Sequence, residues 1–219
     1  MRATSILRWA AVAALVLAPA AANAATRGYV YTVRHAKYGV IGAYNRTVDD
    51  GGGEMRARSH LQVRVKIMGI TMHRETADQV ETWRDGRLAA FQSDTLVNGK
   101  DIKVSGQAQS GRFAITSPTG VVMAPPDVAA SDPWSFSHTG RGTVVSLRSG
   151  KLDQVDVTGG EPERVTVNGA QVTARHYRVS TDTQPDKWEV WLEADGLPVK
   201  FRSFDHGAAV DFNLASHTP

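Results

Sequence analysis

Residues 188–201 read Trp-Glu-Val-Trp-Leu-Glu-Ala-Asp-Gly-Leu-Pro-Val-Lys-Phe, and this stretch decides the fold class. Its centre is Asp195-Gly196, a dipeptide that accepts the positive φ angles of a tight hairpin turn. Before the turn, every second side chain is apolar and shares one face of an extended chain: Trp188, Val190 and Leu192. After the turn, Pro198 stands at a strand start, where its missing N–H costs least. The stretch therefore predicts an antiparallel β-hairpin.

The same two signals recur over the rest of the chain. Residues 60–67 alternate strictly, and their predicted core face consists of Leu61, Val63, Val65 and Ile67. Further turn dipeptides separate such segments: Asp85-Gly86, Asn98-Gly99, Ser149-Gly150 and Asn168-Gly169. No segment combines a sustained helical period with caps. Residues 76–83 come nearest, but they lead straight into an Asp-Gly turn and are predicted as strand.

We expect an all-β fold, made of one strongly curved antiparallel sheet. It would be a half-barrel or barrel of successive hairpins with little helix, since a flat sheet of so many strands would leave long exposed edges. Residues 118–133 include several prolines, which cannot donate to a ladder, and are predicted as a loop with a turn of helix at 127–131. This loop is expected to be either a lid or a disordered segment.

Residues 1–24 are predicted to be a signal peptide that is cleaved after Ala24. Arg2 and Arg8 lie beside an apolar run, and Ala22-Asn23-Ala24 supplies the small residues of a cleavage site. The run is shorter than the roughly 20 residues that a membrane-spanning helix needs. We expect a mature single domain over 25–219, without a transmembrane segment, in the periplasm of a bacterium.

The composition of the chain excludes several kinds of site and argues against one class of partner. It has 219 residues, with 25 basic and 22 acidic side chains and no Cys. Two of the bases and none of the acids lie in the leader, so cleavage lowers the net charge from +3 to +1. A nearly neutral domain gives no reason to expect a nucleic-acid partner. The lack of Cys excludes disulfides, thiol nucleophiles, Cys-based zinc sites and an acylated lipoprotein terminus.

No catalytic, metal or cofactor motif stands out in the sequence. The seven histidines are scattered without metal-ligand spacing: His35, His60, His73, His138, His176, His206 and His217. His73 and Glu75 come closest to such a spacing, and this pair is interpreted as part of a solvated strand face. There is no Gly-x-Ser-x-Gly elbow, and no glycine-rich loop that leads into a helix. The sequence therefore favours a protein that is not an enzyme.

One predicted strand has a basic face, formed by Arg56, Arg58, Arg64 and Lys66. No aromatic side chain is interleaved with these bases, as a site for single-stranded nucleic acid would require. We expect this face to keep the sheet hydrated. A contact with anionic lipid headgroups is the alternative interpretation.

Large aromatic side chains are the remaining candidates for a site. In a curved sheet they either fill the interior or line a pocket for an apolar ligand. Trp134 and Phe136 directly follow the proline-rich loop, so this Trp is placed to anchor the loop at the mouth of a barrel. The predicted ligand-binding residues are Trp83, Trp134, Phe136 and Trp188.

The order of these turns and aromatics resembles an uncharacterised family of exported bacterial proteins, a domain of unknown function. The segments that carry the resemblance are Tyr31-Thr-Val33, Gly39-Val-Ile41-Gly42, Glu81 to Leu88, Thr95 with Asn98-Gly99, Trp134, and Trp188 to Phe201. The family pattern has Asn where this chain has Ser135, which argues against a polar site there. Such families are similar to the half-barrels of lipoprotein carriers, which hold acyl chains on a concave face. The resemblance implies a fold and a compartment, and no activity.

These observations favour a non-catalytic periplasmic protein that binds a hydrophobic or lipid-like ligand. One alternative is a hydrolase-type enzyme whose site is assembled across strands. The other is a structural or assembly protein that pairs through a sheet edge. An open apolar cavity within the sheet favours binding, whereas several histidines paired with carboxylates in one pocket favour an enzyme.

Overall fold

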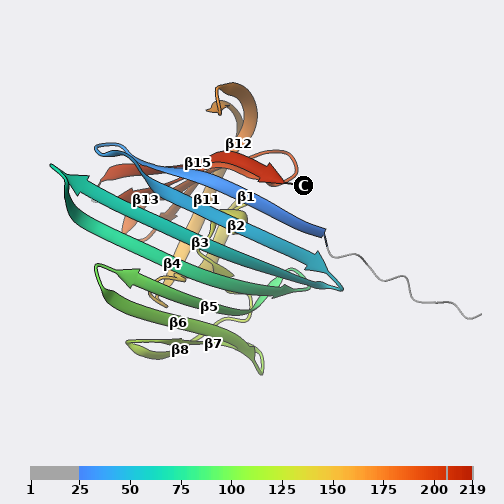
Figure 1. Ribbon diagram of the computed structural model, residues 1–219. Coiled ribbons are helices and arrows are strands. Elements are labelled where there is room, and N and C mark those ends of the chain that lie inside the picture. Colours follow the sequence, from blue (N-terminus) through green and yellow to red (C-terminus); the bar gives the residue numbers. More distant parts are fainter. Residues whose placement is uncertain (1–24, 206, 219) are drawn as a thin grey trace, which may run out of the picture.

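The computed structural model describes residues 25–205 and 207–218. It contains one sheet of fifteen strands and one turn of 3-10 helix (Figure 1). These elements are β1 (Ala25–His35), β2 (Gly39–Gly51), β3 (Glu54–Ile67), β4 (Ile70–Arg84), β5 (Arg87–Val97), β6 (Lys100–Gln109), β7 (Arg112–Ser117), β8 (Gly120–Ala124), β9 (Ala129–Ala130), η1 (Pro133–Ser135), β10 (Gly140–Val145), β11 (Leu152–Val167), β12 (Ala170–Thr181), β13 (Gln184–Leu192), β14 (Pro198–Asp205) and β15 (Ala208–Thr218). Within the described residues, no helix is long and apolar enough to cross a membrane.

Two meanders run outward from the central pair β1–β15. On one side β2 to β8 follow β1 in order, and on the other side β14 to β9 follow β15 in reverse order. The first and last strands are antiparallel, with Gly28 opposite Thr218 and His35 opposite Val210. Among the described strands, β9 and β10 are the one parallel pair. The two edge strands, β8 and β9, do not pair with each other in the described part of the chain, so the barrel stays open.

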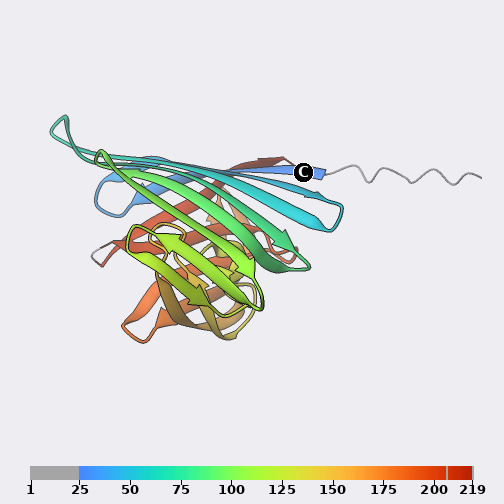
Figure 2. The same cartoon turned by 90° about the horizontal axis from the view of Figure 1, so that it is seen from below.

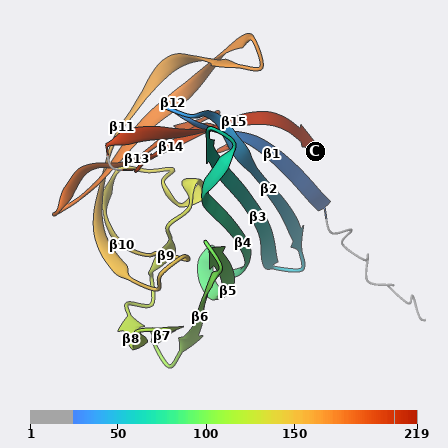
Figure 3. The same cartoon turned by 60° about the vertical axis from the view of Figure 1, so that its left-hand side comes forward.

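The sheet curls around an interior that holds η1, as Figure 3 shows. This architecture confirms the predicted fold class, a single strongly curved antiparallel sheet built of successive hairpins. Residues 76–83 lie in β4 and are strand, as the Asp-Gly turn after them predicted. The predicted closing hairpin is β13–β14, in which Trp191 lies opposite Lys200 and Pro198 opens the second strand.

Apolar and aromatic side chains from the inner faces fill much of the interior. Tyr31 is completely buried, and its hydroxyl donates a hydrogen bond to the Pro198 carbonyl oxygen at 2.8 Å, which ties β1 to β14. Burial raises the pKa of Tyr31. Under β5–β7, the rings of Phe91 and Phe113 are parallel with centroids 6.0 Å apart. A Cβ at Gly106 would lie 2.3 Å from the Phe91 ring, so only glycine fits between them.

The antiparallel order places the turns at two ends of the molecule. We call the end with the turns at 52–53, 85–86 and 193–197 the mouth end, and the end with the turns at 36–38, 68–69 and 98–99 the far end. The segment 146–151 connects β10 to β11 at the far end. There Arg148 Nε lies 2.9 Å from Glu75 Oε1, an ion pair that joins the two meanders.

The expectation of a loop over 118–133 was wrong in part. Residues 120–124 form β8, which pairs with β7, and residues 129–130 form β9. A strand fits here because Pro118 lies in the turn before β8 and Pro125 follows its last residue, so neither proline has to donate to the ladder. The expected turn of helix comes later, at η1. The segment that follows β8 is neither a lid nor disordered, since Val128, Ala130 and Pro133 are buried.

The predicted core face of residues 60–67 is also wrong at its end. Val63 and Val65 are buried, Leu61 is half-buried, and Ile67 is exposed. The physical reason is that β3 extends beyond its neighbour β2, because the pairing between the two strands stops at Val63. Val65, two residues further on, still reaches the core, but at Ile67 the apolar face of the strand has no interior left to enter.

Candidate functional site

Three charged side chains lie inside the curled sheet: Arg46 from β2, Glu81 from β4, and Asp132 from the segment before η1. They are 2%, 1% and 6% exposed, and we call them the buried charge cluster. Arg46 Nη1 donates to Glu81 Oε1 at 2.9 Å, and Arg46 Nη2 lies 3.6 Å from Asp132 Oδ2. Arg46 is directed inward because it shares a strand face with Tyr44 and Val48, which are core residues.

The cluster positions aromatic side chains around it. Trp83 Nε1 donates to the second oxygen of Glu81, Oε2, at 3.1 Å. The Arg46 guanidinium carbon lies over the Trp134 ring, 4.3 Å from its centroid, in a cation–π contact. The Trp134 ring also lies 5.8 Å from that of Tyr29 and 6.2 Å from that of Tyr31. Both tryptophans are therefore fixed from the interior side.

Asp132 holds η1 in place as its N-cap. Its Oδ1 accepts a hydrogen bond from the Ser135 backbone N–H at 3.1 Å, and Pro133 occupies the start of the turn. One carboxyl group thus connects the turn that carries Trp134 to the Arg46 side chain on β2. The segment from β9 to η1 is pinned inside the sheet.

The shifted pKa values of Asp132 and Arg46 favour a buried charge cluster near electrical neutrality. Burial raises the pKa of Asp132 well above its usual value, and the Glu81 carboxylate beside it raises it further, while Arg46 acts in the opposite direction. Burial alone would lower the pKa of Arg46, but Glu81 and Asp132 together raise it well above its usual value. With the proton on Asp132, the cluster consists of one guanidinium and one carboxylate, because a second uncompensated buried charge would be costly.

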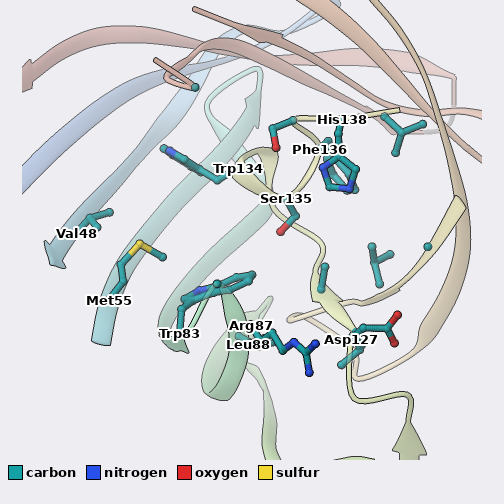
Figure 4. Close-up of a pocket in the computed structure, with 18 of the residues that line it drawn as sticks. Val48, Met55, Trp83, Arg87, Leu88, Asp127, Trp134, Ser135, Phe136 and His138 are labelled. Carbon is teal, nitrogen blue, oxygen red and sulfur yellow. The ribbon is translucent and has the colours of Figure 1, made fainter. Parts of the chain in front are cut away.

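A cavity of about 890 Å³ opens at the mouth end, next to this cluster (Figure 4). Apolar side chains from both meanders form its walls: Val48, Met55 and Leu88 from one, and Val144, Val155 and Val157 from the other. In Figure 4, Trp134 and Phe136 lie along one side of the space and Trp83 along the other. The cavity therefore runs between the two meanders, and the inward segment 127–139 contributes one of its walls.

The rim of the cavity carries charges of both signs. It includes Arg27, Arg87, Arg141, Asp50, Asp85, Asp127 and Asp195. Some of these pair across strands, such as Arg27 Nη2 with Asp50 Oδ2 at 3.5 Å. A cavity that combines apolar and aromatic walls with polar and charged side chains suits a ligand whose body is apolar and whose end is polar.

Three of the four predicted site residues meet at this cavity. Trp83, Trp134 and Phe136 line it. Trp188 does not, but it stacks behind Phe136 with ring centroids 5.6 Å apart and an interplanar angle of 21°. Trp188 therefore supports the wall from outside.

The sequence interpretation missed the buried charge cluster. A signal was present, because Arg46 follows Tyr44 and precedes Val48 in strict alternation, which puts a charge at a core position. Glu81 lies two residues before Trp83 with the same parity. No local pattern marks Asp132, since its burial depends on the path of the whole segment.

The histidines that the structure describes do not gather in one pocket. His60 Nδ1 lies 2.7 Å from Asp78 Oδ1 beside a shallow outer hollow of about 300 Å³, and His176 Nδ1 lies 2.8 Å from Glu163 Oε2. Burial lowers the pKa of His176. His73 contacts Glu75, which is already paired with Arg148 at the far end. Among the described residues no group of three His, Asp or Glu side chains is placed to hold a metal ion, and His206 lies outside those residues.

Comparisons with known proteins agree with the fold and leave the activity open. A family described as Domain of unknown function (DUF6134) matches residues 31–215. A comparison with curated proteins finds no match. Among solved structures, the chain is similar to a beta-barrel-like protein of domain of unknown function DUF1849 from Brucella abortus. The similarity has a TM-score of 0.64 at 9% identity and covers 88% of this chain and 96% of that one, so it concerns the fold alone.

Proposed function

Because this chain belongs to the family described as Domain of unknown function (DUF6134), whose name carries no activity, we propose a function from the cavity itself. The protein binds a hydrophobic or lipid-like ligand, without chemical change, in the periplasm of a bacterium. The observation that carries this proposal is the cavity of about 890 Å³ with Trp83, Trp134 and Phe136 on its walls. Small-molecule pockets typically measure ~300–1,000 Å³ and are lined mainly by apolar and aromatic groups.

The aromatic wall is organised before any ligand arrives. Trp83 is held by its hydrogen bond to Glu81, Trp134 by the Arg46 guanidinium, and Phe136 by the stacked ring of Trp188. A ligand that enters does not have to order these side chains, so little conformational entropy is lost on binding.

The arrangement favours binding over hydrolysis. His138 is the one histidine on the cavity wall, it is exposed, and among the described residues no carboxylate is hydrogen-bonded to it. The two buried carboxyl groups, Glu81 and Asp132, lie behind the wall rather than on it. A general base has to reach the proton that it removes, and neither group is placed to do so.

The proposal is tested on protein purified from the periplasm of an expressing bacterium, by native mass spectrometry and analysis of its organic extract. Gly142 offers a sharp variant, because it lines the cavity and a Cβ there meets no atom within 4 Å. We expect the wild-type protein to carry a lipid-like molecule and Gly142→Trp, whose indole obstructs part of the cavity, to lose it. The matched control is Gln154→Trp on the exposed side of the neighbouring strand β11. An empty wild-type protein, or a ligand retained by Gly142→Trp, contradicts the proposal.

A second candidate function is assembly through the edge strand β8. Its side chains Val121, Val122 and Met123 are exposed, which is unusual for an edge that has to avoid pairing with other chains. Under this proposal the mass measured by light scattering rises with concentration, and Val122→Lys abolishes the rise. A constant monomer mass for the wild-type protein excludes it.

A further inference from the structure

The hairpin between β3 and β4 extends beyond the rest of the sheet. Pairing of β3 with β2 stops at Val63, and pairing of β4 with β5 stops at Glu75. Between Val63 and Glu75 the two strands pair in the ladder only with each other, although Arg74 still exchanges hydrogen bonds with Asn98 at the base of the ribbon. Figure 2 shows this ribbon, in teal, reaching past the neighbouring turns. Val65 at the base of the ribbon is still buried, but residues 66–72 beyond it are all exposed. A two-stranded ribbon without a packed face gains little stability of its own, so the length of this outer part calls for a reason other than folding.

The tip of the ribbon is apolar and uncovered. The exposed fractions are 41% for Ile67, 98% for Met68, 66% for Ile70 and 59% for Met72. Such a cluster of large apolar side chains on a surface marks a contact site more often than chance exposure does.

The turn at residues 68–69 contains a residue type that disfavours its backbone conformation. Met68 has a φ of 50° and Gly69 a φ of 81°, so a bulky residue occupies the left-handed region. Three other hairpin turns of the chain place Asp85, Asn98 or Asn168 at this position, which are residues that tolerate it. A methionine here costs stability and contributes nothing to the core.

Behind the apolar tip the ribbon is basic. Arg64 lies directly opposite Arg74 in the β3–β4 ladder, a like-charge pair that destabilises the hairpin. Neither these two arginines nor Lys66 has an ion-pair partner among the described residues. The sequence from Arg56 to Arg74 contains no acidic residue at all. An anionic surface would neutralise the repulsion that the fold leaves in place.

We propose that the β3–β4 ribbon docks onto the surface of an anionic membrane. Met68 and its apolar neighbours enter the boundary between headgroups and acyl chains, while Arg64, Lys66 and Arg74 contact lipid phosphates. The apolar side chains at the tip match the acyl chains of the membrane. The cations a few residues behind them match the layer of headgroup phosphates. The ribbon and the cavity lie at opposite ends of β3, since Met55 lines the cavity and Ile67 ends the strand, so this inference does not depend on the proposed ligand.

The test is flotation of the full protein, with its mass recorded, on vesicles of phosphatidylethanolamine and phosphatidylglycerol and on vesicles of phosphatidylcholine. We expect binding to the anionic vesicles alone, weakened by added salt. Arg64→Gln with Arg74→Gln should lower the partition coefficient by at least about tenfold. The control Lys103→Gln with Arg84→Gln removes the same charge from exposed sites elsewhere. It should leave the partition coefficient within about twofold of the wild-type value.

Insertion of the tip is tested separately. The triple variant Met68→Asn, Ile70→Ser, Met72→Ser keeps a good turn residue and should lose vesicle binding while its thermal unfolding is unchanged or improved. Because the chain has no Cys, Met68→Cys accepts a single environment-sensitive dye, with Ser110→Cys in another turn as the control. We expect a blue shift on anionic vesicles for the dye at position 68 only. Equal binding by the tip variant, no wild-type binding to anionic vesicles, or no shift at position 68 overturns the proposal.

Discussion

The guanidinium of Arg46 and the indole of Trp134 are in contact inside the curled sheet, with the Arg46 carbon 4.3 Å from the ring centroid. This contact joins a sheet strand to the segment that crosses the interior. It sets one wall of the cavity, because Trp134 and Phe136 belong to that segment. The cavity therefore exists in its present form only while the segment stays docked.

Trp134→Ala should lower the free energy of unfolding by about 3 kcal/mol, since it removes a large packed ring and a cation–π contact. Urea denaturation followed by circular dichroism measures the change. Met68→Ala, at a site that is fully exposed, should change the same quantity by less than about 0.5 kcal/mol. Equal stability of the two variants would show that Trp134 does not hold the segment.

Arg46→Met should lower the free energy of unfolding by roughly 3–5 kcal/mol, because it leaves the Glu81 carboxylate buried without its cation. Adding Glu81→Gln removes that charge and should restore part of the loss. The two denaturation curves are compared at the same pH. A single variant as stable as the wild type, or a double variant that is worse than the single one, contradicts the role of the ion pair.

Asp132→Asn should change how stability depends on pH. The unfolded chain releases the Asp132 proton near the usual pKa, whereas the folded protein keeps it, because burial and Glu81 raise the pKa. Folding thus takes up a proton, and the wild type loses about 1.4 kcal/mol per pH unit from this group between the unfolded and the folded pKa. The loss is absent below the unfolded pKa and complete above the folded one.

The asparagine variant keeps the oxygen that caps η1 and has no proton to lose. Denaturation is measured at pH 5, 6, 7 and 8. The free energy of unfolding of the variant should rise relative to that of the wild type as the pH rises. Parallel profiles for the two proteins would mean that Asp132 is ionised in the folded state.

Cleavage after Ala24 should leave a mature chain that begins at Ala25. N-terminal sequencing and intact mass of periplasmic protein check this. Ala24→Trp places a bulky residue where signal peptidase needs a small one and should leave the leader attached. A mature protein that still contains residues 1–24, or full processing of the variant, contradicts the prediction.

Much of the fold could be predicted because its signals are local. The Asp195-Gly196 turn and the alternation around it occur within one hairpin, and the same holds along both meanders. The error at 118–133 came from treating prolines as a bar to any strand, although β8 fits between Pro118 and Pro125. Ile67 was misplaced because alternation says which face a residue shares, and not whether that face is covered.

The site could be predicted only in part. Large aromatics next to turns and loops pointed to Trp83, Trp134 and Phe136, which do line one cavity. The polar groups that fix them come from three distant segments, and their meeting depends on the curl of the whole sheet. A charge at a core position in an alternating strand, as at Arg46, is the one sign that the sequence offers.

The most direct test of the account is equilibrium binding of a fluorescent fatty-acid probe to delipidated protein, with Gly142→Trp and Gln154→Trp beside the wild type. We predict saturable binding of one probe per chain to the wild type and to Gln154→Trp, and a loss of at least about tenfold in affinity for Gly142→Trp, because the added ring occupies the cavity. Unsaturable binding to the wild type, or an unchanged affinity in Gly142→Trp, would contradict the claim that this cavity is a ligand site.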